Sequence, residues 1–294
     1  MSPPPSQRVW EVPILGHRAV SVAGRTLRRF SLLCLMLAAG DVLAFHDEPV
    51  ARAVLLRVAQ TTEIAESVRR PLPPASLAKL ALAVVALESD AMRGHALVRV
   101  SAASALQTGS RIGLREGERV SNGELLAATL IASANDACHA LAEHVAGSAQ
   151  AAVVRMNALA RRLGMAATVF MDPCGHDRQG QRTTAADLER LADAVMRQPR
   201  LLELAGTREM RIASAGGRQI ALKSTNRLLA SYPGAAGLKT GYTASAGSCL
   251  IALARRDGVE VLLILLAADD RWEDAERLLD AGFARARERK APGA

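Results

Sequence analysis

The last third of the chain carries the pattern that most constrains the fold. Three apolar, strand-like segments lie at 236–242, 248–255 and 259–268, and Asp257-Gly258 between the last two is a two-residue hairpin signal. The segment 271–290 then has the spacing of an amphipathic helix. These residues predict an antiparallel meander that ends in a helix.

An early strand and a long helical region complete the pattern. Residues 53–58 have the composition of a strand, and a helix is predicted from Ala75 to about Ser89. Helical periodicity continues from 121 to 196, beginning with one helix from Glu124 to Glu143. Helices placed between an early strand and a late meander indicate an α+β fold, with one sheet built from both ends of the chain.

The N-terminal segment has the features of a secretory signal. Arg28-Arg29 precede an apolar stretch at 30–40 that is short for a membrane span. The small residues that end at Ala44 suit a signal peptidase, so cleavage is predicted after Ala44, with Ala39 as the second choice. The predicted location is the periplasm, or the inner membrane if the leader remains as an anchor. The predicted segments are a leader at 1–44, a catalytic domain at 45–290 with a helical lobe at about 90–215, and a tail at 291–294.

The composition excludes one class of partner. The formal charge is +8, but aromatic residues make up 3% of the chain and no basic run is interleaved with them. Stacking platforms for nucleic-acid bases are therefore missing, and no nucleic-acid partner is expected. The positive excess suits anionic lipid and wall polymers, and solubility alone explains it nearly as well. The basic segment 285–290 allows peripheral contact with a membrane.

The cysteines do not define a disulfide. Beyond the leader, Cys138, Cys174 and Cys249 are an odd number of thiols, so at least one has no partner within the chain. Cys138 and Cys174 are candidates to pair in an oxidising periplasm. Sequence separation does not decide this, and we predict reduced, buried thiols.

Lysine is scarce, which draws attention to the positions that keep it. Of the 37 Lys and Arg residues, only those at 79, 223, 239 and 290 are lysine. A guanidinium stays protonated in proteins, whereas a buried amine loses its proton. A site that needs a base therefore requires lysine, and two of these four positions fall in such motifs.

Ser76 and Lys79 form the first motif, Ser-x-x-Lys. On a helix that begins near Ala75, positions three apart lie about one turn above each other, so the amine reaches the hydroxyl. Ser76 then lies at the helix start, where free N–H groups stabilise a developing oxyanion. A plain helix cap explains a lone serine here equally well, so this motif needs support from others.

Two further motifs supply that support. Ser133 and Asn135 interrupt an apolar helical stretch. In a functional site, Ser133 would act as a proton relay and Asn135 would bind a substrate amide. Polar residues at a helix kink give the same pattern. Lys239, Thr240 and Gly241 begin a strand whose cation and hydroxyl suit an extended peptide with a terminal carboxylate, and the glycine allows close approach. The order and spacing of the three motifs are those of penicillin-binding proteins and class A β-lactamases.

On these residues, the sequence resembles the low-molecular-mass penicillin-binding proteins of the D-alanyl-D-alanine carboxypeptidase family. The likeness extends over about 50–284 and includes Asp172-Pro173, Asn226-Arg-Leu-Leu229 and the run from Gly237 to Thr243. The resemblance implies a β-lactamase/transpeptidase-like α+β fold. In that fold an antiparallel five-stranded sheet has flanking helices and an inserted all-α lobe, and the active site lies between them.

The resemblance also implies a role for each motif residue. Ser76 is the acylated nucleophile, Lys79 its proton acceptor and Ser133 the third catalytic residue. The implied substrate-binding residues are Asn135, Lys239, Thr240, Gly241, Tyr242 and Arg271, and the N–H groups of Ser76 and Tyr242 form the oxyanion hole. Cys174 and His176 depart from the usual loop residues, which puts the substrate preference in question.

The predicted activity is that of a serine-type carboxypeptidase acting on peptidoglycan stem peptides that end in D-Ala-D-Ala, with β-lactam antibiotics as covalent inhibitors. A peptidoglycan endopeptidase uses the same residues and is the alternative. A β-lactamase is less favoured because no glutamate lies between Glu143 and Glu189, where such enzymes carry the base for deacylation. A non-catalytic penicillin-binding sensor is the remaining alternative.

No cofactor and no metal site are predicted. His139 and His144 are five residues apart, which places them about 140° apart around a helix. They therefore do not converge on one ion as histidines spaced by four would, and a zinc peptidase is excluded.

Overall fold

The computed structural model describes residues 51–290. The predicted leader with its cleavage points and the tail at 291–294 lie outside the described residues, so these predictions stand untested. Within 51–290, none of the helices combines the length and the apolar character needed to cross a lipid bilayer.

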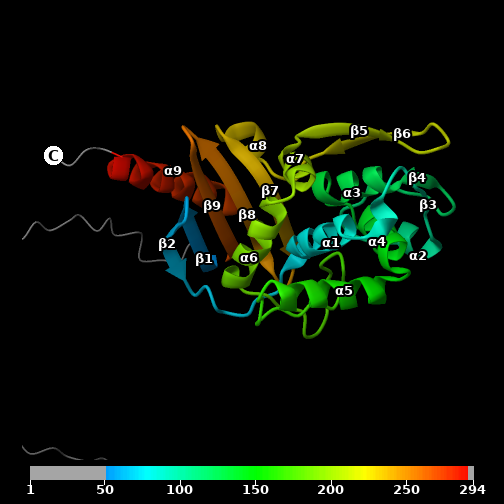
Figure 1. Cartoon of the computed structure of the whole chain (residues 1–294), viewed down its shortest axis with the longest axis horizontal. Helices are drawn as coiled ribbons and strands as arrows, with labels where there is room; N and C mark the ends of the chain where they lie inside the picture. Colours follow the sequence, from blue (N-terminus) through cyan, green and yellow to red (C-terminus); the bar gives the residue numbers. More distant parts are fainter. Residues whose placement is uncertain (1–50, 291–294) are drawn as a thin grey trace, which may run out of the picture. The chain divides into compact units, whose positions relative to one another are not determined.

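An antiparallel sheet of five strands forms the centre of the fold, in the order β2-β1-β9-β8-β7 (Figure 1). The strands are β1 (Ala51–Val58), β2 (Thr61–Glu66), β7 (Ala235–Thr243), β8 (Gly247–Arg256) and β9 (Val259–Ala268). β8 and β9 are joined at Asp257 and Gly258, which both have positive φ. Because β1 pairs with β9, the sheet is assembled from both ends of the chain, as predicted.

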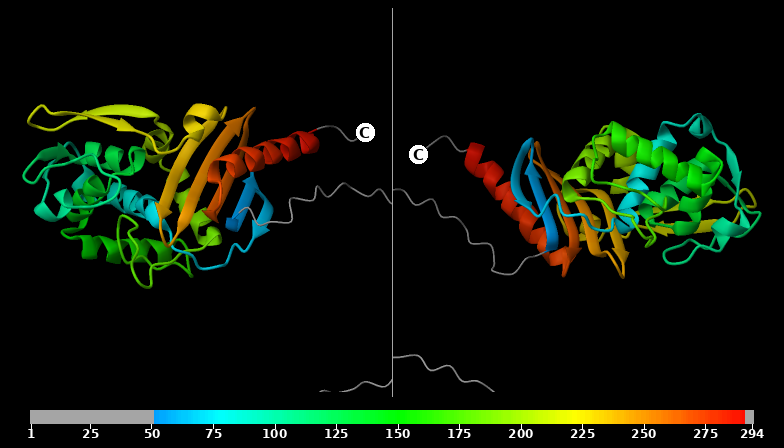
Figure 2. Two further views of the ribbon diagram at one scale, coloured as in Figure 1. Left: turned by 180° about the vertical axis from the view of Figure 1, so that it is seen from behind. Right: turned by 90° about the horizontal axis from the view of Figure 1, so that it is seen from below.

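Helices cover both faces of this sheet, as the two views of Figure 2 show. α9 (Arg271–Lys290) packs on one face, against β1, β8 and β9, while α6 (Ala185–Met196) packs on the other. Strands buried on both faces have continuous apolar runs rather than alternating ones, and β8 and β9 follow this rule. Gly282 lets α9 come close, since a Cβ there would lie 2.9 Å from Val261 Cγ1.

The helical lobe stands beside the β7 edge of the sheet (Figure 1). Its main helices are α1 (Ala78–Leu87), α3 (Asn122–Ile131), α4 (Asn135–Ala146) and α5 (Ala149–Arg162), and its shorter elements are η1 (Ala75–Leu77), η2 (Asp90–Met92), α2 (Ala102–Ala105) and α7 (Pro199–Gly206). α8 (Leu228–Ser231) lies against β7. α1 is apolar all round because other helices surround it, and it is buried from Ala78 to Ala86. Its side chains form much of the core.

The lobe differs from the prediction in several details. The single helix expected from Glu124 to Glu143 is two helices, α3 and α4, because the chain breaks at Ser133, which has φ of 54°. The lobe also carries two small antiparallel pairs that the sequence did not predict, β3 (Leu97–Arg99) with β4 (Arg119–Ser121) and β5 (Glu209–Ala213) with β6 (Gln219–Lys223). The break places the Ser133 hydroxyl against Lys239 of β7.

Candidate active site

The candidate nucleophile lies where the chain enters the central helix. Ser76 is in the 3₁₀ helix η1 and Lys79 is in the first turn of α1, so that Lys79 Nζ lies 2.9 Å from Ser76 Oγ. Two glycines allow neighbouring segments to press on this turn. A Cβ on Gly175 would overlap the carbonyl oxygen of Ala75, and one on Gly241 would lie 3.0 Å from Ala75 Cβ.

The Lys79 amine is enclosed by oxygen atoms. The residue is 0% exposed, and its Nζ donates to Asn135 Oδ1 at 2.7 Å and to the carbonyl oxygen of Cys174 at 2.6 Å. Burial lowers the pKa of Lys79 to about 7, against the opposing effect of the Asp172 charge. A neutral amine has two hydrogens, which these two oxygens accept, so its lone pair faces the Ser76 hydroxyl. This arrangement is that of a general base.

The Asn135 amide is held from three sides. Its Oδ1 accepts from Lys79, and its Nδ2 donates to the carbonyl oxygen of Thr108 at 2.5 Å. Since a carbonyl only accepts, this bond fixes which end of the amide is nitrogen. The second N–H points at His176 Nε2, 3.2 Å away, so that ring nitrogen is the acceptor.

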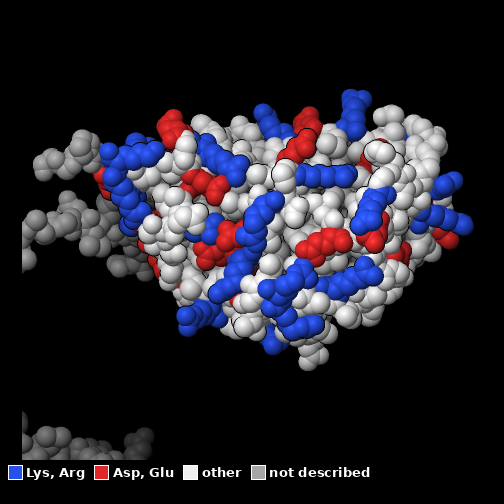
Figure 3. All heavy atoms as spheres, viewed as in Figure 1, with Lys and Arg blue, Asp and Glu red and all other residues white. Residues whose placement is uncertain are grey.

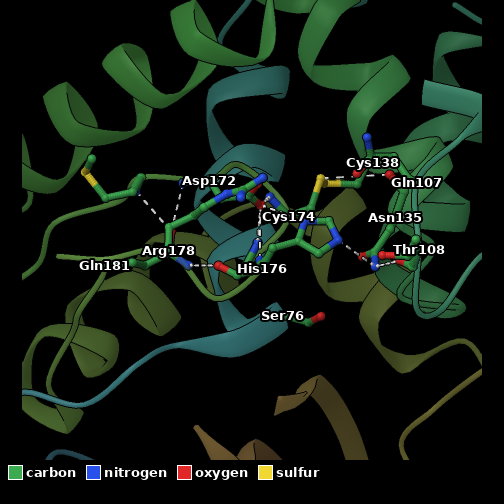
Figure 4. Close-up of polar contacts among 12 residues, drawn as sticks. Ser76, Gln107, Thr108, Asn135, Cys138, Asp172, Cys174, His176, Arg178 and Gln181 are labelled. Carbon is green, nitrogen blue, oxygen red and sulfur yellow. Dashed lines mark hydrogen bonds and ion pairs between the residues drawn. A yellow bond between two sulfur atoms is a disulfide. The ribbon is translucent and has the colours of Figure 1, made fainter. Parts of the chain in front are cut away.

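The loop that carries His176 is organised by Asp172. Asp172 Oδ1 accepts from the backbone N–H groups of Cys174, Gly175 and His176 and from His176 Nδ1 at 3.2 Å. Burial alone would raise the pKa of Asp172, but the hydrogen bonds and charge of His176 and the backbone donors outweigh it and hold the pKa below its usual range. Figure 4 shows the resulting chain from Asp172 through His176 to Asn135, beside Ser76.

A disulfide joins this loop to the second motif. Cys138, one turn after Asn135 on α4, is bonded to Cys174, with 5.9 Å between the Cα atoms (Figure 4). The prediction of reduced thiols is therefore wrong for this pair, because the fold brings together two cysteines whose sequence separation of 36 carried no such information. Cys249 is a buried free thiol, whose pKa burial raises to about 11. The disulfide ties together the segments that supply both oxygen partners of Lys79.

The second lysine connects the third motif to the second. Lys239 is buried on β7, and its Nζ donates to Ser133 Oγ at 2.8 Å and to the carbonyl oxygen of Thr240 at 3.0 Å. Burial lowers the pKa of Lys239 well below its ordinary value, and the charges of Lys79 and Arg271 lower it further. The strand β7 is an edge of the sheet, as expected.

The remaining predicted residues lie on the same strand or next to it. The Thr240 hydroxyl contacts that of Thr225 at 2.6 Å, and the Tyr242 side chain is 67% exposed. Arg271, at the start of α9, donates to the carbonyl oxygen of Gly241 at 2.6 Å. The structure therefore brings all three motifs and Arg271 to one region. Sequence reasoning missed Thr108 and Asp172 as supporting residues, because their contacts are with distant parts of the chain.

A titratable cluster lies next to this region. His139 of α4, Asp172 and His176 have ligand-type atoms within 4.8 Å of one another. Burial lowers the pKa of His139, while Asp172 opposes this effect and His176 adds to it. No sequence pattern predicted the cluster, since only the pairing of α4 with the loop after Met171 brings the three together.

Comparisons with known proteins identify relatives of this chain. The family model described as D-alanyl-D-alanine carboxypeptidase matches residues 50–270. The D-alanyl-D-alanine carboxypeptidase DacF of Bacillus subtilis is 33% identical over 218 residues, which are 72% of this chain and 56% of that protein. The chain thus spans little more than half the length of that relative.

An endopeptidase and a solved structure are also similar. The D-alanyl-D-alanine endopeptidase of Pseudomonas aeruginosa is 31% identical over 211 residues, covering 70% of this chain and 68% of that protein. The crystal structure of the Streptomyces K15 DD-transpeptidase superposes with a TM-score of 0.75 at 26% identity, covering 80% of this chain and 97% of that one.

Proposed function

This chain belongs to the D-alanyl-D-alanine carboxypeptidase family, and from that premise we propose that it removes the terminal D-alanine from peptidoglycan stem peptides through an acyl-enzyme on Ser76. One observation carries the proposal. The Lys79 amine is buried against Ser76, and its pKa is lowered to about 7. A neutral amine that can accept the hydroxyl proton is therefore present at neutral pH.

Acylation begins with proton transfer from Ser76 to neutral Lys79. Ser76 Oγ attacks the carbonyl carbon between the two D-alanines, and the C–N bond then breaks. The departing amine takes the proton that Lys79 accepted, which is passed on by way of Ser133, and Lys79 becomes neutral again; Ser133 also contacts Lys239. Water next cleaves the ester on Ser76, which restores the hydroxyl and releases the shortened peptide as a carboxylate.

Recognition of the free C-terminus is assigned to β7. In the absence of an opposite charge, burial disfavours the protonated form of Lys239, and the charge of Lys79, when that amine is protonated, and the charge of Arg271 add to this effect. A substrate carboxylate supplies that charge, so binding and protonation of Lys239 reinforce each other. Arg271 adds positive charge next to Gly241, and the N–H groups of Ser76 and Tyr242 are assigned to the oxyanion.

An endopeptidase that cleaves cross-linked peptides is the second candidate. It would use the same acyl-enzyme, and the similarity to the Pseudomonas aeruginosa endopeptidase supports it. A β-lactamase is less favoured, since the chain has no glutamate between Glu143 and Glu189. Penicillin is therefore expected to remain on Ser76.

Export to the periplasm is part of the proposal, because the substrate lies in the cell wall. The signal-like leader supports this location. Basic side chains also gather over α5 and α6 on the face drawn in Figure 3, and their positive charge would attract anionic wall polymers or lipid headgroups.

The test uses purified chain with a fluorescent penicillin, a pentapeptide ending in D-Ala-D-Ala, and a cross-linked muropeptide. We expect stable label on the wild type, none on Ser76→Ala, and release of D-alanine from the pentapeptide. Cleavage of the cross-linked substrate in preference to the pentapeptide favours the endopeptidase. Rapid loss of label, or labelling of Ser76→Ala, rules out the proposal.

A further inference from the structure

The cluster of His139, Asp172 and His176 is not used by the proposed reaction. His139 projects from α4, and the other two come from the loop that follows Met171. The rings of His139 and His176 are tilted by 54°, with 6.1 Å between their centroids. Imidazole nitrogens with one carboxylate are the donor set that zinc prefers, and three protein ligands leave a fourth position open.

Two of the three donors have unoccupied ligand atoms. Among residues 51–290, neither ring nitrogen of His139 has a hydrogen-bond partner. Asp172 Oδ2 also makes no hydrogen bond in this range, and the charged group nearest to it is Arg178 Nε at 3.9 Å. Arg178 is largely exposed, with 63% of its side chain accessible, so it can move away from an incoming ion. The third donor, His176 Nδ1, exchanges its bond to Asp172 Oδ1 for the ion.

The site is accessible and its parts are held together. His139, Asp172 and Arg178 line a hollow of about 370 Å³, through which an ion and its water can enter. The disulfide between Cys138 and Cys174 fixes the neighbouring residues of both segments. Donor atoms bound to one zinc ion lie roughly 3 to 3.5 Å apart. The ligand atoms of the three residues already lie within 4.8 Å of one another, so modest rotations of the two partly exposed imidazoles bring them to that separation.

From these observations we infer that His139, Asp172 and His176 bind one divalent transition-metal ion, of which zinc is the representative. The ion is distinct from the acylation machinery, since Lys79 and Ser76 do not contact the three ligands by any hydrogen bond in the described part of the chain. Its effect passes through the imidazole of His176.

Metal binding forces a change of tautomer at His176. Without metal, Nδ1 carries the proton toward Asp172, and Nε2 accepts from Asn135 Nδ2. With the metal on Nδ1, the ring proton moves to Nε2. Two N–H groups, one on His176 Nε2 and one on Asn135 Nδ2, then face each other with no acceptor between them. The amide cannot turn to resolve this conflict, because Thr108 requires the nitrogen where it is.

Asn135 therefore loses one of its anchors when the ion binds. Since the same amide orients Lys79, acylation of Ser76 should slow by roughly fivefold, the value of one ordinary hydrogen bond. This effect rests on the proposed function, whereas metal binding itself does not.

Isothermal titration of the full chain with zinc, after treatment with a chelator, tests the site. We expect one ion per chain, and binding more than about tenfold weaker in His139→Gln and His176→Gln. His144→Gln is the matched control, because His144 is on the same helix and bonds to the carbonyl oxygen of Ala91. Equal affinity in His139→Gln, or no saturable binding to the wild type, overturns the assignment.

A second measurement covers variants that fail to fold and separates the two proposals. Cobalt(II) added to the wild type should give the strong visible absorption of a four-coordinate ion, and zinc should remove it. Labelling by fluorescent penicillin should slow with zinc in the wild type but not in His139→Gln. Slowing in both means that the ion acts elsewhere, and no slowing in either refutes the coupling. Absence of labelling without zinc refutes only the proposed function.

Discussion

Replacing Lys79 by arginine is the sharpest test of the proposed base. Arginine keeps the positive charge and the hydrogen-bond donors, but it does not deprotonate near neutral pH. The amine of Lys79, by contrast, has a pKa lowered to about 7 by burial. If the neutral amine takes the proton of Ser76, charge alone cannot replace it.

The expected magnitudes follow from this pKa. The neutral fraction of an amine with a pKa near 7 rises from roughly 10% at pH 6 to roughly 90% at pH 8, so acylation should rise about ninefold over that range. The activity is lost as pH falls, because protonation removes the lone pair. Loss of a general base costs about 10² to 10⁴ in rate, which is the expected deficit of Lys79→Arg at pH 7.

Stopped-flow labelling with saturating fluorescent penicillin measures the acylation rate without contribution from weak binding. Lys223→Arg is the control, since Lys223 is exposed on β6. Thermal melts followed by circular dichroism establish that both variants fold. A rate that does not change between pH 6 and 8, or a Lys79→Arg enzyme within tenfold of the wild type, would refute the reasoning.

Three further changes test the structure around the site. Serine in place of both Cys138 and Cys174 should lower the melting temperature and slow labelling, since closing a loop with a sequence separation of 36 is worth up to about 4 kcal/mol; an unchanged melting temperature contradicts this. Gly241→Ala should slow acylation more than about tenfold, because the added Cβ would lie 3.2 Å from the backbone nitrogen of Ser76. Gly216→Ala is the control and should leave the rate unchanged, since the atom nearest to its added Cβ is 3.9 Å away. Lys239→Met should raise KM for the D-Ala-D-Ala peptide by about ten- to a hundredfold, and an unchanged KM in steady-state kinetics would exclude it as the carboxylate ligand.

Much of the architecture could be predicted because it is encoded locally. The meander from Ala235 to Ala268 follows from apolar runs and the Asp257-Gly258 turn, and the bounds of its strands differ from the predicted ones by at most one residue. The contact of Lys79 with Ser76 was predictable, since their spacing of three places them one helical turn apart. The contacts of Lys79 with Asn135 and of Lys239 with Ser133 were not predicted, because they join separate segments. The exposed hairpin of β5 and β6 has short strands with weak patterns, so it was missed.

Other features depend on contacts that no local pattern reports. Ser133 lies in a run of apolar residues typical of one long helix, yet it has a positive φ and its hydroxyl accepts from Lys239 of the distant strand β7. The pairing of Cys138 with Cys174 and the contact of His176 with Asn135 arise where a loop folds back on α4. Such contacts are set by tertiary structure, which the sequence separation of the partners does not reveal.

The pairing of β1 with β9 has a consequence for how the molecule matures. Ala51 is opposite Ala268, so this register requires closure of a loop that contains most of the chain, and non-local pairing of this kind folds slowly. Ser76 and Lys79 emerge early, but β7, which faces them, joins the sheet only through β8 and β9. A nascent or truncated polypeptide therefore contains Ser76 and Lys79 without the strand that faces them, and the proposed site is complete only when the last strands have paired.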